Sequence, residues 1–406
     1  MNNKPRVSIV RCTTYDLDAV EAAIRCALEP LGGISAFVQP GQRVLLKPNL
    51  LRAVSPERAA TTHPAIVAAI ARLVFEAGGQ PIVVESPGGP YMARWLNAVY
   101  KATGMYWASE VSGVPLNEDY RSVNVPHPEG ALLHRLDIVQ PLTEADVVIN
   151  LPKFKTHNLV GLTLAVKNLF GLIPGTTKMG YHSKLQDRSL FCEGLLDIYT
   201  YVKPALHIMD AILGMEGEGP SGGDPREMGL LLASPDGLAM DTVCAALVGL
   251  EPTAVLTTRR AVARGLTSGR LEDLEIVGED WEAVRIPNFR MGIEMPIDPG
   301  LAKGPLRAVL QKISSGEASQ GRKTGPLARL SRWLGTQMVA APYAGPKCIG
   351  CGFCARHCPV NAITIVNRKA VMDLSKCIRC YCCHELCPET AVELRKPWLG
   401  RLLSRG

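Results

Sequence analysis

The sequence predicts an α/β protein in which a domain with a largely parallel sheet precedes a small α+β module. Short apolar, β-rich segments alternate with longer amphipathic segments up to about residue 285. This order is typical of a parallel sheet that is covered by helices on both faces. Two cysteine runs of equal spacing then occupy residues 347–360 and 376–390, and they predict the second module.

The first domain, residues 1–285, contains the alternating segments. Its expected strands are residues 6–12, 42–50, 80–88, 145–154, 204–212, 228–234 and 274–279. Its clearest expected helices are residues 16–32, 63–79 and 240–250. Asp16 and Gly32 suit the start and end of the first helix, and Thr62 would cap the second, ahead of Pro64. Residues 91–135 predict an inserted lobe that begins with a helix.

The remaining segments are a basic linker at 286–340 with short helices, the cysteine-rich module at 341–392 and a basic tail at 393–406. Large apolar side chains stand among arginines and lysines in the linker and tail: Trp333, Leu334, Trp398, Leu399, Leu402 and Leu403. This pattern suits either weak contact with an anionic membrane surface or packing onto the two domains, and packing is the favoured interpretation.

Each cysteine run reads C-x2-C-x2-C-x3-C-P, the spacing of bacterial ferredoxins that carry two 4Fe–4S clusters. The first three cysteines of a run surround one cluster, and the fourth, before proline, reaches the other. One cluster is therefore assigned to Cys348, Cys351, Cys354 and Cys387. The other is assigned to Cys377, Cys380, Cys383 and Cys358. Thiolates are the soft ligands that such clusters select.

The alternatives for these cysteines are a disulfide framework or two zinc sites. No signal peptide is evident, which disfavours disulfides, and zinc sites usually use two C-x2-C pairs. Cys382 is the surplus thiol of the second run. Its counterpart in the first run is Phe353, so we expect Cys382 to be a buried packing residue.

Composition narrows the class of protein. No segment approaches 18 consecutive apolar residues, so we expect no transmembrane segment, and the predicted location is cytoplasmic. Aromatic residues make up only 5% of the chain, which disfavours a base-stacking surface, so no nucleic acid is expected as a partner. The net charge of +6 is uneven, with a marked basic excess between residues 301 and 340.

Cations and amides gather near the ends of two expected strands. Lys47 and Asn49 end the strand in 42–50, and Lys153, Lys155 and His157 follow the strand in 145–154. Burying several ammonium groups is costly unless an anion compensates, which favours a phosphate or carboxylate site over solvated lysines. The anion-binding candidates are Lys47, Asn49, Lys153, Lys155, Lys167 and Asn168. The catalytic candidates are Lys153, Lys155, His157, Lys167 and Asp210.

A third segment, residues 208–225, is rich in glycine and acidic residues. Residues 217–222 match GxGxxG, but they include Glu218 and Pro220, and another strand follows instead of a helix. The pattern therefore predicts a turn with close backbone approach and not a dinucleotide site. Asp210 and Glu216 remain candidates to position a ligand or bind a cation.

Three blocks resemble the recurrent blocks of the domain of unknown function 362 family. They are SPGGPYMARWLNAVYKATGM (86–105), INLPKFKTHNLVGLTLAVKNLFG (149–171) and DAILGMEGEGPSGGDP (210–225). The resemblance extends over roughly residues 7–285, and many members of the family end in a ferredoxin-like module. It implies a Rossmann-like domain in an iron–sulfur protein, but it implies no particular reaction.

Two functional hypotheses follow. In the first, the protein is a ferredoxin-coupled oxidoreductase that transfers electrons to or from an anionic small molecule or cofactor held by the α/β domain. In the alternative, it is an electron carrier or assembly subunit that docks a partner enzyme and has no chemistry of its own. Both hypotheses predict a redox partner protein. A structural or sensing role for the clusters is a third, less favoured reading.

Overall fold

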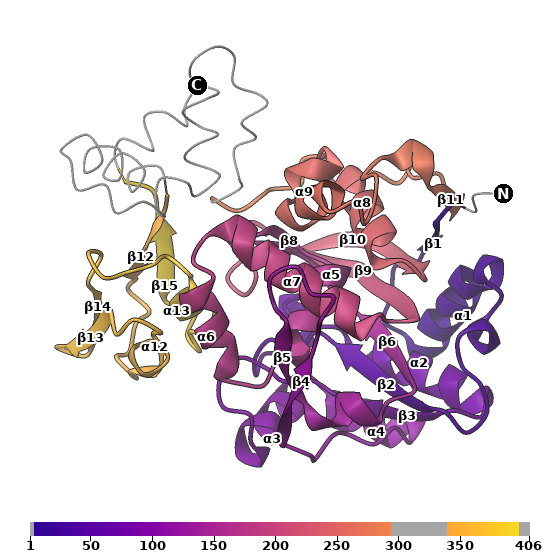
Figure 1. Cartoon of the computed structure of the whole chain (residues 1–406), viewed down its shortest axis with the longest axis horizontal. Helices are drawn as coiled ribbons and strands as arrows, with labels where there is room; N and C mark the ends of the chain where they lie inside the picture. Colours follow the sequence, from indigo (N-terminus) through magenta and orange to yellow (C-terminus); the bar gives the residue numbers. More distant parts are fainter. Residues whose placement is uncertain (1–3, 294–338, 398–406) are drawn as a thin grey trace, which may run out of the picture.

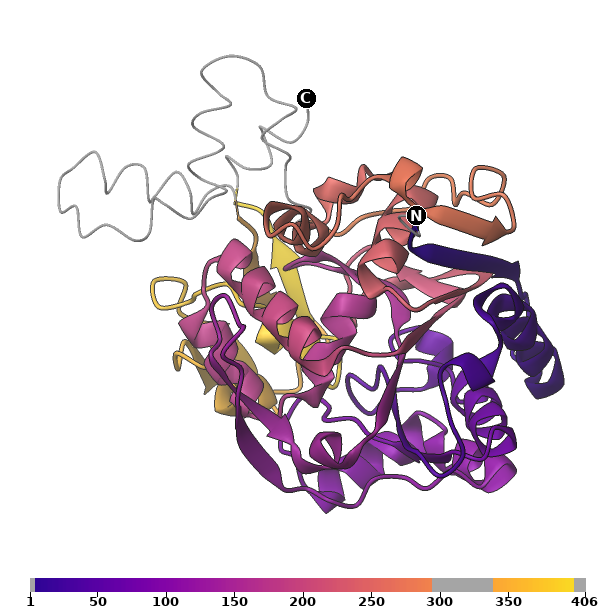
Figure 2. The same ribbon diagram turned by 45° about the vertical axis from the view of Figure 1, so that its right-hand side comes forward.

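The computed structural model describes residues 4–293 and 339–397. The α/β domain forms the larger part, and the cysteine-rich module lies beside it next to α6 (Thr177–Lys184) (Figures 1 and 2). Most of the expected linker and most of the tail, with their apolar and basic side chains, lie outside the described residues.

The central sheet is mixed but largely parallel, as predicted. Its strands run in the order β11-β1-β10-β9-β6-β2-β3, and β7 and β8 are attached beside β9. The strands are β1 (Arg6–Arg11), β2 (Arg43–Pro48), β3 (Gln80–Val83), β6 (Val147–Leu151), β7 (Lys153–His157), β8 (Gly161–Thr163), β9 (Leu206–Glu216), β10 (Asp224–Ser234) and β11 (Glu275–Gly278). β10 pairs antiparallel with β1 and β9, and β8 pairs antiparallel with β7, whereas the other pairs in this sheet are parallel.

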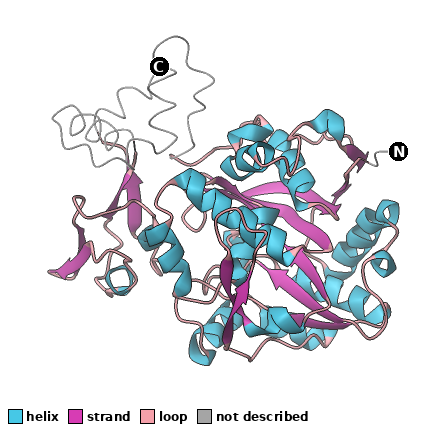
Figure 3. Cartoon of the chain, in the orientation of Figure 1, coloured by secondary structure: helices cyan, strands magenta, loops and turns pink. Residues whose placement is uncertain are grey.

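Helices cover both faces of the sheet (Figure 3). One face is packed by α1 (Leu17–Leu28), α2 (Pro64–Glu76), α3 (Ala93–Ala102) and α4 (Met105–Ser112). The other is packed by α5 (Ala165–Asn168), α7 (Arg188–Val202), α8 (Gly237–Leu247) and α9 (Leu256–Ala263). Strand β2 shows the alternation, since Val44 and Leu46 join the first core and Leu45 joins the second. A separate ribbon pairs β4 (Ser122–Pro126) with β5 (Arg135–Val139).

Several local predictions are confirmed and one is wrong. Asp16 caps α1 by accepting from the Ala19 amide, and Pro64 occupies the first turn of α2. The N-cap of α2 is His63 and not Thr62. Thr62 instead accepts from the Asn49 amide at 2.8 Å and donates to the Leu151 carbonyl at 2.7 Å. It therefore ties the segment before α2 to the ends of β2 and β6.

In two segments the strands have other bounds than expected. The strand predicted at 145–154 is divided by Pro152 into β6 and β7, because proline has no amide to donate to a ladder. The segment 208–225 is the end of β9, a turn and the start of β10. Lys153, Lys155 and Asp210 are consequently held on strands inside the protein and not on solvated loops.

The cysteine-rich module has the short antiparallel strands of a ferredoxin-like fold. β12 (Ala341–Ala344) pairs with β15 (Val392–Arg395), and β13 (Ile363–Val366) pairs with β14 (Lys369–Met372). Two short helices, α12 (Phe353–Arg356) and α13 (Cys382–Glu385), each contain the third cysteine of a run. The duplicated sequence thus folds into two related halves.

Specific contacts join this module to the α/β domain. Trp95 of α3 stacks on Phe353 with ring centroids 5.2 Å apart. The buried Arg52 guanidinium donates to the carbonyls of Cys387 and Pro388. His384 of α13 lies 3.2 Å from the Glu218 carbonyl oxygen, and both halves of the module therefore touch the larger domain.

A buried carboxylate on α7 supports the second helical layer and gives the first prediction. Asp197 is fully buried, accepts from the amides of Ala131, Leu132 and Leu133 at 2.8–2.9 Å, and pairs with Arg264 at 2.9 Å. We expect Asp197→Ala to lower the unfolding free energy by about 3–5 kcal/mol, because it leaves three buried amides without their acceptor and removes the nearer of the two carboxylates that pair with Arg264.

Anaerobic urea unfolding followed by far-UV circular dichroism measures this loss. Asp18→Ala is the control, since its side chain is 93% exposed, and it should change stability by less than about 0.5 kcal/mol. Equal effects of the two substitutions would contradict the proposed role of Asp197.

Candidate functional site

A buried ion pair marks the carboxyl edge of the parallel strands. Lys47, at the end of β2, places Nζ 2.8 Å from Glu85 Oε2 and 2.7 Å from the Pro48 carbonyl oxygen. Glu85, which follows β3, also accepts from the Leu50 amide at 3.0 Å. Burial lowers the pKa of Lys47, and the Glu85 carboxylate opposes that shift. Because carboxyl ends of parallel strands meet at one edge, this is where a ligand site is expected.

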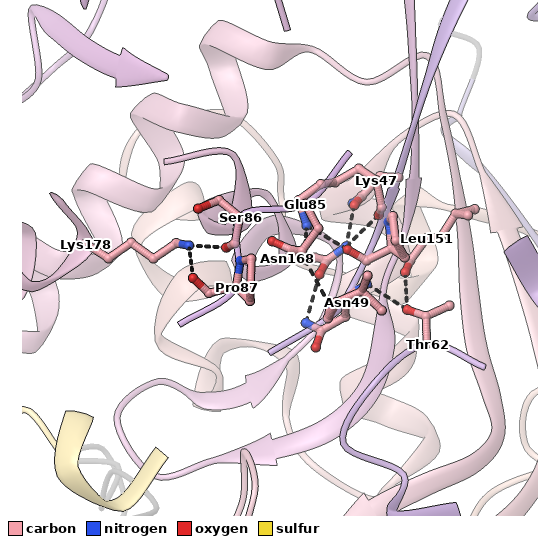
Figure 4. Close-up of polar contacts among 12 residues, drawn as sticks. Lys47, Asn49, Thr62, Glu85, Ser86, Pro87, Leu151, Asn168 and Lys178 are labelled. Atoms are coloured by element: carbon pink, nitrogen blue, oxygen red, sulfur yellow. Dashed lines mark hydrogen bonds and ion pairs between the residues drawn. The ribbon is translucent and has the colours of Figure 1, made fainter. Parts of the chain in front are cut away.

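An asparagine network connects this edge to α5. Asn168 donates to the Lys47 carbonyl at 3.1 Å and to Asn150 Oδ1 at 2.8 Å. Its own Oδ1 accepts from Asn49 Nδ2 at 2.8 Å, and Asn49 Oδ1 accepts from Lys155 Nζ at 2.8 Å. Figure 4 shows how Asn49, Asn168 and Lys47 converge. The network holds the ends of β2, β6 and β7 in one rigid arrangement.

A second buried ion pair lies deeper in the sheet. Lys153 Nζ is 2.8 Å from Asp210 Oδ2 and 3.0 Å from the Tyr15 hydroxyl, which donates to Asp210 Oδ1 at 2.7 Å. The His63 amide also donates to Asp210. Burial lowers the pKa of Lys153, and Asp210 opposes that shift. Lys153 and Asp210 therefore neutralise each other inside the protein.

Three further lysines have no carboxylate at ion-pair distance within the described ranges. Lys155 is fully buried, and Lys167 and Lys178 are surrounded by protein but keep some accessible surface. Lys167 Nζ lies 4.8 Å from the centre of the Phe170 ring. Lys178 Nζ donates to the carbonyls of Ser86 and Pro87 (Figure 4). The groups in contact with these three amines are therefore carbonyls, an amide and an aromatic ring, and not carboxylates.

The pKa values of these three lysines are lower than those of lysines in water. Burial lowers the pKa of Lys167 and lowers that of Lys155 well below its usual range. Burial lowers the pKa of Lys178 to about 7; Glu85 opposes the shift, while Lys47 and Lys167 add to it. A bound anion would raise the pKa values of all three lysines.

A pocket opens between these lysines and the cysteine-rich module. It encloses about 610 Å³, including its open mouth. On the side of the α/β domain its lining includes Asn49, Glu85, the 86–89 loop, Lys167, Asn168, Lys178 and His182. On the side of the module its lining is Cys382, Glu385 and Leu386. Gly88 lies so close to Leu386 that an added Cβ would be 2.1 Å from its side chain, so the two walls are in direct contact.

One acidic side chain of the module faces the lysines. Glu385 is buried, and its Oε1 lies 3.3 Å from His157 Nε2 but has no hydrogen bond of good geometry. His157 Nδ1 accepts from the Leu159 amide at 3.1 Å. Burial lowers the pKa of His157 far below its usual range, with Lys167 and Lys155 adding to the shift, so its imidazole is neutral. Because Nδ1 accepts the bond from the Leu159 amide, the proton of the neutral ring is on Nε2, which faces Glu385 Oε1 across the domain interface.

The cysteines surround two further cavities. One, of about 340 Å³, is lined by Cys348, Cys351, Cys354 and Cys387. The other, of about 360 Å³, is lined by Cys358, Cys377, Cys380 and Cys383, and also by Cys382. Within the described ranges, no three Cys, His, Asp or Glu groups are arranged to hold a single metal ion. Each set of four thiols instead lines a cavity.

The chemistry of both cavities fits an iron–sulfur cluster. Backbone amides point at the sulfurs: Ala362 at Cys358 and Ala391 at Cys387, both at 3.2 Å, and Arg379 at Cys377 at 3.4 Å. Such donors stabilise negative charge on sulfur. Burial raises the pKa of Cys354 to about 11, and the neighbouring thiols add to the shift. Gathering four thiolates there therefore needs positive charge, which iron would supply.

The glycine-rich turn does not belong to the pocket. Glu216 and Asp224 both pair with Arg290, at 2.9 and 2.7 Å, which accounts for their charges. An added Cβ on Gly219 would lie 2.1 Å from the Thr156 carbonyl oxygen. The prediction of a turn with close backbone approach is therefore confirmed, and the pocket lies elsewhere.

The structure brings some sequence candidates together and adds others. Asn49, Lys167 and Asn168 line the pocket, whereas Lys47, Lys153, Lys155, His157 and Asp210 stand behind its wall or deeper in the sheet. The residues that sequence reasoning missed are Glu85, Lys178, His182 and Glu385. Glu85 lies within the predicted strand 80–88, and only the observed end of β3 at Val83 places it after the strand. Lys178, on α6, has no signal in its local pattern.

Comparisons with known proteins agree with this architecture. Residues 44–246 match the family described as Domain of unknown function (DUF362), and residues 347–391 match a 4Fe-4S dicluster domain. "Thylakoid-associated protein sll1697" from Synechocystis sp. is 38% identical over 305 residues, which cover 73% of this chain and 91% of the relative.

Two solved structures show weak likeness. The lactate racemase apoprotein from Thermoanaerobacterium thermosaccharolyticum has a TM-score of 0.38 at 13% identity, over 62% of this chain and 58% of that one. A protein from Thermotoga maritima has a TM-score of 0.33 at 13% identity, over 56% and 57% of the two chains. The chain thus spans less than two thirds of either structure.

The family match, the close relative and the two cysteine-lined cavities together lead to one conclusion: the chain is a member of the DUF362 family that carries a 4Fe–4S ferredoxin-like domain with an iron–sulfur electron-transfer role.

Proposed function

We propose that the protein holds two 4Fe–4S clusters and exchanges electrons with an anionic small molecule bound in the pocket between its two domains, as a ferredoxin-coupled oxidoreductase. One cluster would be held by Cys348, Cys351, Cys354 and Cys387, and the other by Cys358, Cys377, Cys380 and Cys383. When bound, such clusters supply one-electron transfer.

One observation carries the proposal: Cys382 lines both the pocket and the cavity of the second cysteine set. A single buried side chain therefore separates the ligand space from that cavity. A pocket built only by the α/β domain would not need a wall from the cysteine-rich module. The shared wall favours a site at which the two domains act together.

The charge of the pocket supports an anionic ligand. Lys167 and Lys178 line it without carboxylate partners in the described parts of the chain, and Lys155 lies behind Asn49 and donates to it. We assign Lys167 and Lys178 to binding and orienting the anion. Glu385, which lines the pocket, would accept a hydrogen bond from a protonated group of the ligand, and the Nε2–H of the neutral His157 beside it would orient this carboxylate.

The alternative function, an electron carrier without its own chemistry, has one observation in its favour. Lys47 and Lys153 are already neutralised by Glu85 and Asp210, so part of the lysine cluster needs no ligand. Normal electron transfer after the loss of Lys167 and Lys178 would support this alternative.

The proposed location is the cytoplasmic side, where thiols remain reduced. Among the described residues, none of the helices combines the length and the apolarity needed to cross a bilayer. The relative's name describes association with thylakoids. A weak contact of this protein with a membrane surface would agree with that name and would need no membrane-spanning helix. A redox partner protein remains part of the proposal.

The number of clusters can be tested with two adjacent cysteines. We expect anaerobically purified protein to contain about eight irons per chain, and Cys383→Ser to reduce this to about four by removing one ligand of the second set. Iron and acid-labile sulfide assays, with electron paramagnetic resonance of the reduced protein, measure the change. Cys382→Ser is the matched control and should keep both clusters, so iron loss in this control would argue against the ligand assignment.

The anion site can be tested on one helix. Lys178 and Lys184 both belong to α6, but Lys178 lines the pocket and Lys184 is exposed. We expect Lys178→Met to weaken binding of oxalate, succinate or sulfate by about tenfold, the usual cost of a lost charged hydrogen bond. Calorimetry on the anaerobic holoprotein measures it. Lys184→Met should bind as the unaltered protein does, and a similar loss in both variants would refute a specific site.

The lowered pKa of Lys178 predicts that anion binding depends on pH. Below pH 7 the amine is protonated with or without the anion, so affinity should be constant. Above pH 7 the free protein loses this proton, whereas the anion keeps the pKa higher, so binding must take up a proton and weakens as pH rises. We expect up to tenfold loss per pH unit for oxalate, whose own charge is constant there. A flat profile from pH 6 to 9, or an unchanged profile in Lys178→Met, would contradict this origin.

A further inference from the structure

The face of the cysteine-rich module that bears the β13–β14 hairpin points away from the α/β domain (Figure 1). Cys351 is exposed there, although it belongs to the set around the first cavity. Ile349 and Ile365 line the same cavity and are 54% and 38% exposed. The cavity of the first cysteine set thus reaches the surface beneath a small apolar patch.

Basic side chains surround this patch. Lys347, Arg356, Arg368 and Lys369 are all exposed. Arg356 donates to the Cys351 carbonyl at 3.2 Å, and an added Cβ on Gly350 would lie 2.5 Å from the Arg368 backbone, so both arginines adjoin the cysteine loop.

These charges are largely unbalanced. Lys347, Arg368 and Lys369 form no ion pair with any residue in the described parts of the chain. Glu389, which is exposed and lines the same cavity, adds one negative charge at this rim. An exposed apolar centre inside a basic rim is the usual form of a surface that attracts an acidic protein and then excludes water at the contact.

We propose that this face, defined by Lys347, Ile349, Cys351, Ile365, Arg368 and Lys369, docks an acidic one-electron carrier protein. The inference rests on the proposed cluster assignment and adds the place and the charge of the partner. In the exchange, the reduced carrier loses one electron and the first cluster gains one, with no bond made or broken. The reverse transfer has the same balance.

The opposite side of the module explains why the carrier would use this face. Near the second set, α13 is covered by the α/β domain through His384 and Glu385, and Phe353 of the first half is covered by Trp95. Access for a large partner is therefore found where Cys351 is exposed. The ligand pocket and the carrier face would lie at different ends of the cluster pair, so that carrier and ligand do not compete.

Other occupants are less compatible with the face. A second copy of this chain would bring the same basic rim against itself, which is electrostatically unfavourable. An anionic lipid surface would match the charge, and it is distinguished by its own measurement below.

The test uses the double variant Lys347→Glu/Lys369→Glu of the anaerobic holoprotein. An acidic plant-type ferredoxin serves as the carrier. Cytochrome c, which is basic, serves as the comparison protein of opposite charge. For the ferredoxin, we expect the second-order rate constant of electron transfer in stopped flow to fall at least about tenfold at low salt, with a matching loss of binding in calorimetry. For cytochrome c, the rate constant should rise. In the unaltered protein, the rate with ferredoxin should fall steeply as salt increases.

The control Lys101→Glu/Arg285→Glu makes the same charge change at exposed positions of the α/β domain. Equal losses in the two double variants would show a general charge effect and overturn the docking face. Unchanged ferredoxin binding in the patch variant, together with lost binding to vesicles containing phosphatidylserine, would assign the face to a membrane instead. Iron content is measured in every variant, so a failure of the cluster assignment is recognised separately from a failure of docking.

Discussion

The charge balance of buried lysines at the carboxyl edge of the sheet is the constraint on which the site depends. An unpaired ammonium group in the interior costs several kcal/mol, and removing one partner of a buried pair typically costs about 3–5 kcal/mol. Lys47 and Lys153 meet this cost with Glu85 and Asp210, which come from neighbouring strands or the segments after them. These pairs hold the strand ends in register. Lys155, Lys167 and Lys178 have no such carboxylate partner in the described parts of the chain.

The same constraint helps to position the cysteine-rich module. Glu385 brings a carboxylate to the lysine side of the interface, where Lys167 and Lys155 favour its charged form and burial opposes it. Burial is the larger effect and raises the pKa of Glu385, so the module alone does not neutralise the lysines. Arg52 and the stacked Trp95 and Phe353 supply contacts that do not depend on this balance. The pocket can therefore keep net positive charge while its two walls stay together.

The sequence predicts the fold well where periodicity and spacing are strong, and it predicts the site less completely. The alternation of strands and helices, and the cap at Asp16, follow from local patterns. The predicted strand is divided at Pro152, and a second buried strand continues to His157. Lys155 and His157 therefore lie on a strand, whereas the sequence pattern placed them after one. Partners such as Glu85 and Lys178 depend on which segments the fold brings together, and no local pattern contains that information. The contact of α13 with the 86–89 loop is a relation between segments about 300 residues apart.

The two cysteine runs carry different residue types at one position that faces the α/β domain, and the contacts at that position differ accordingly. Phe353 and Cys382 occupy equivalent positions, and both face the α/β domain. Phe353 fills its place with a ring that stacks on Trp95, so that half of the module makes a closed contact. Cys382 is small, and the space beside it is part of the pocket. A phenylalanine at position 382 would extend into that space and bring an apolar ring toward Lys167. The surplus cysteine is buried, as its sequence context predicts, and its small size leaves room for the pocket beside the second cysteine set.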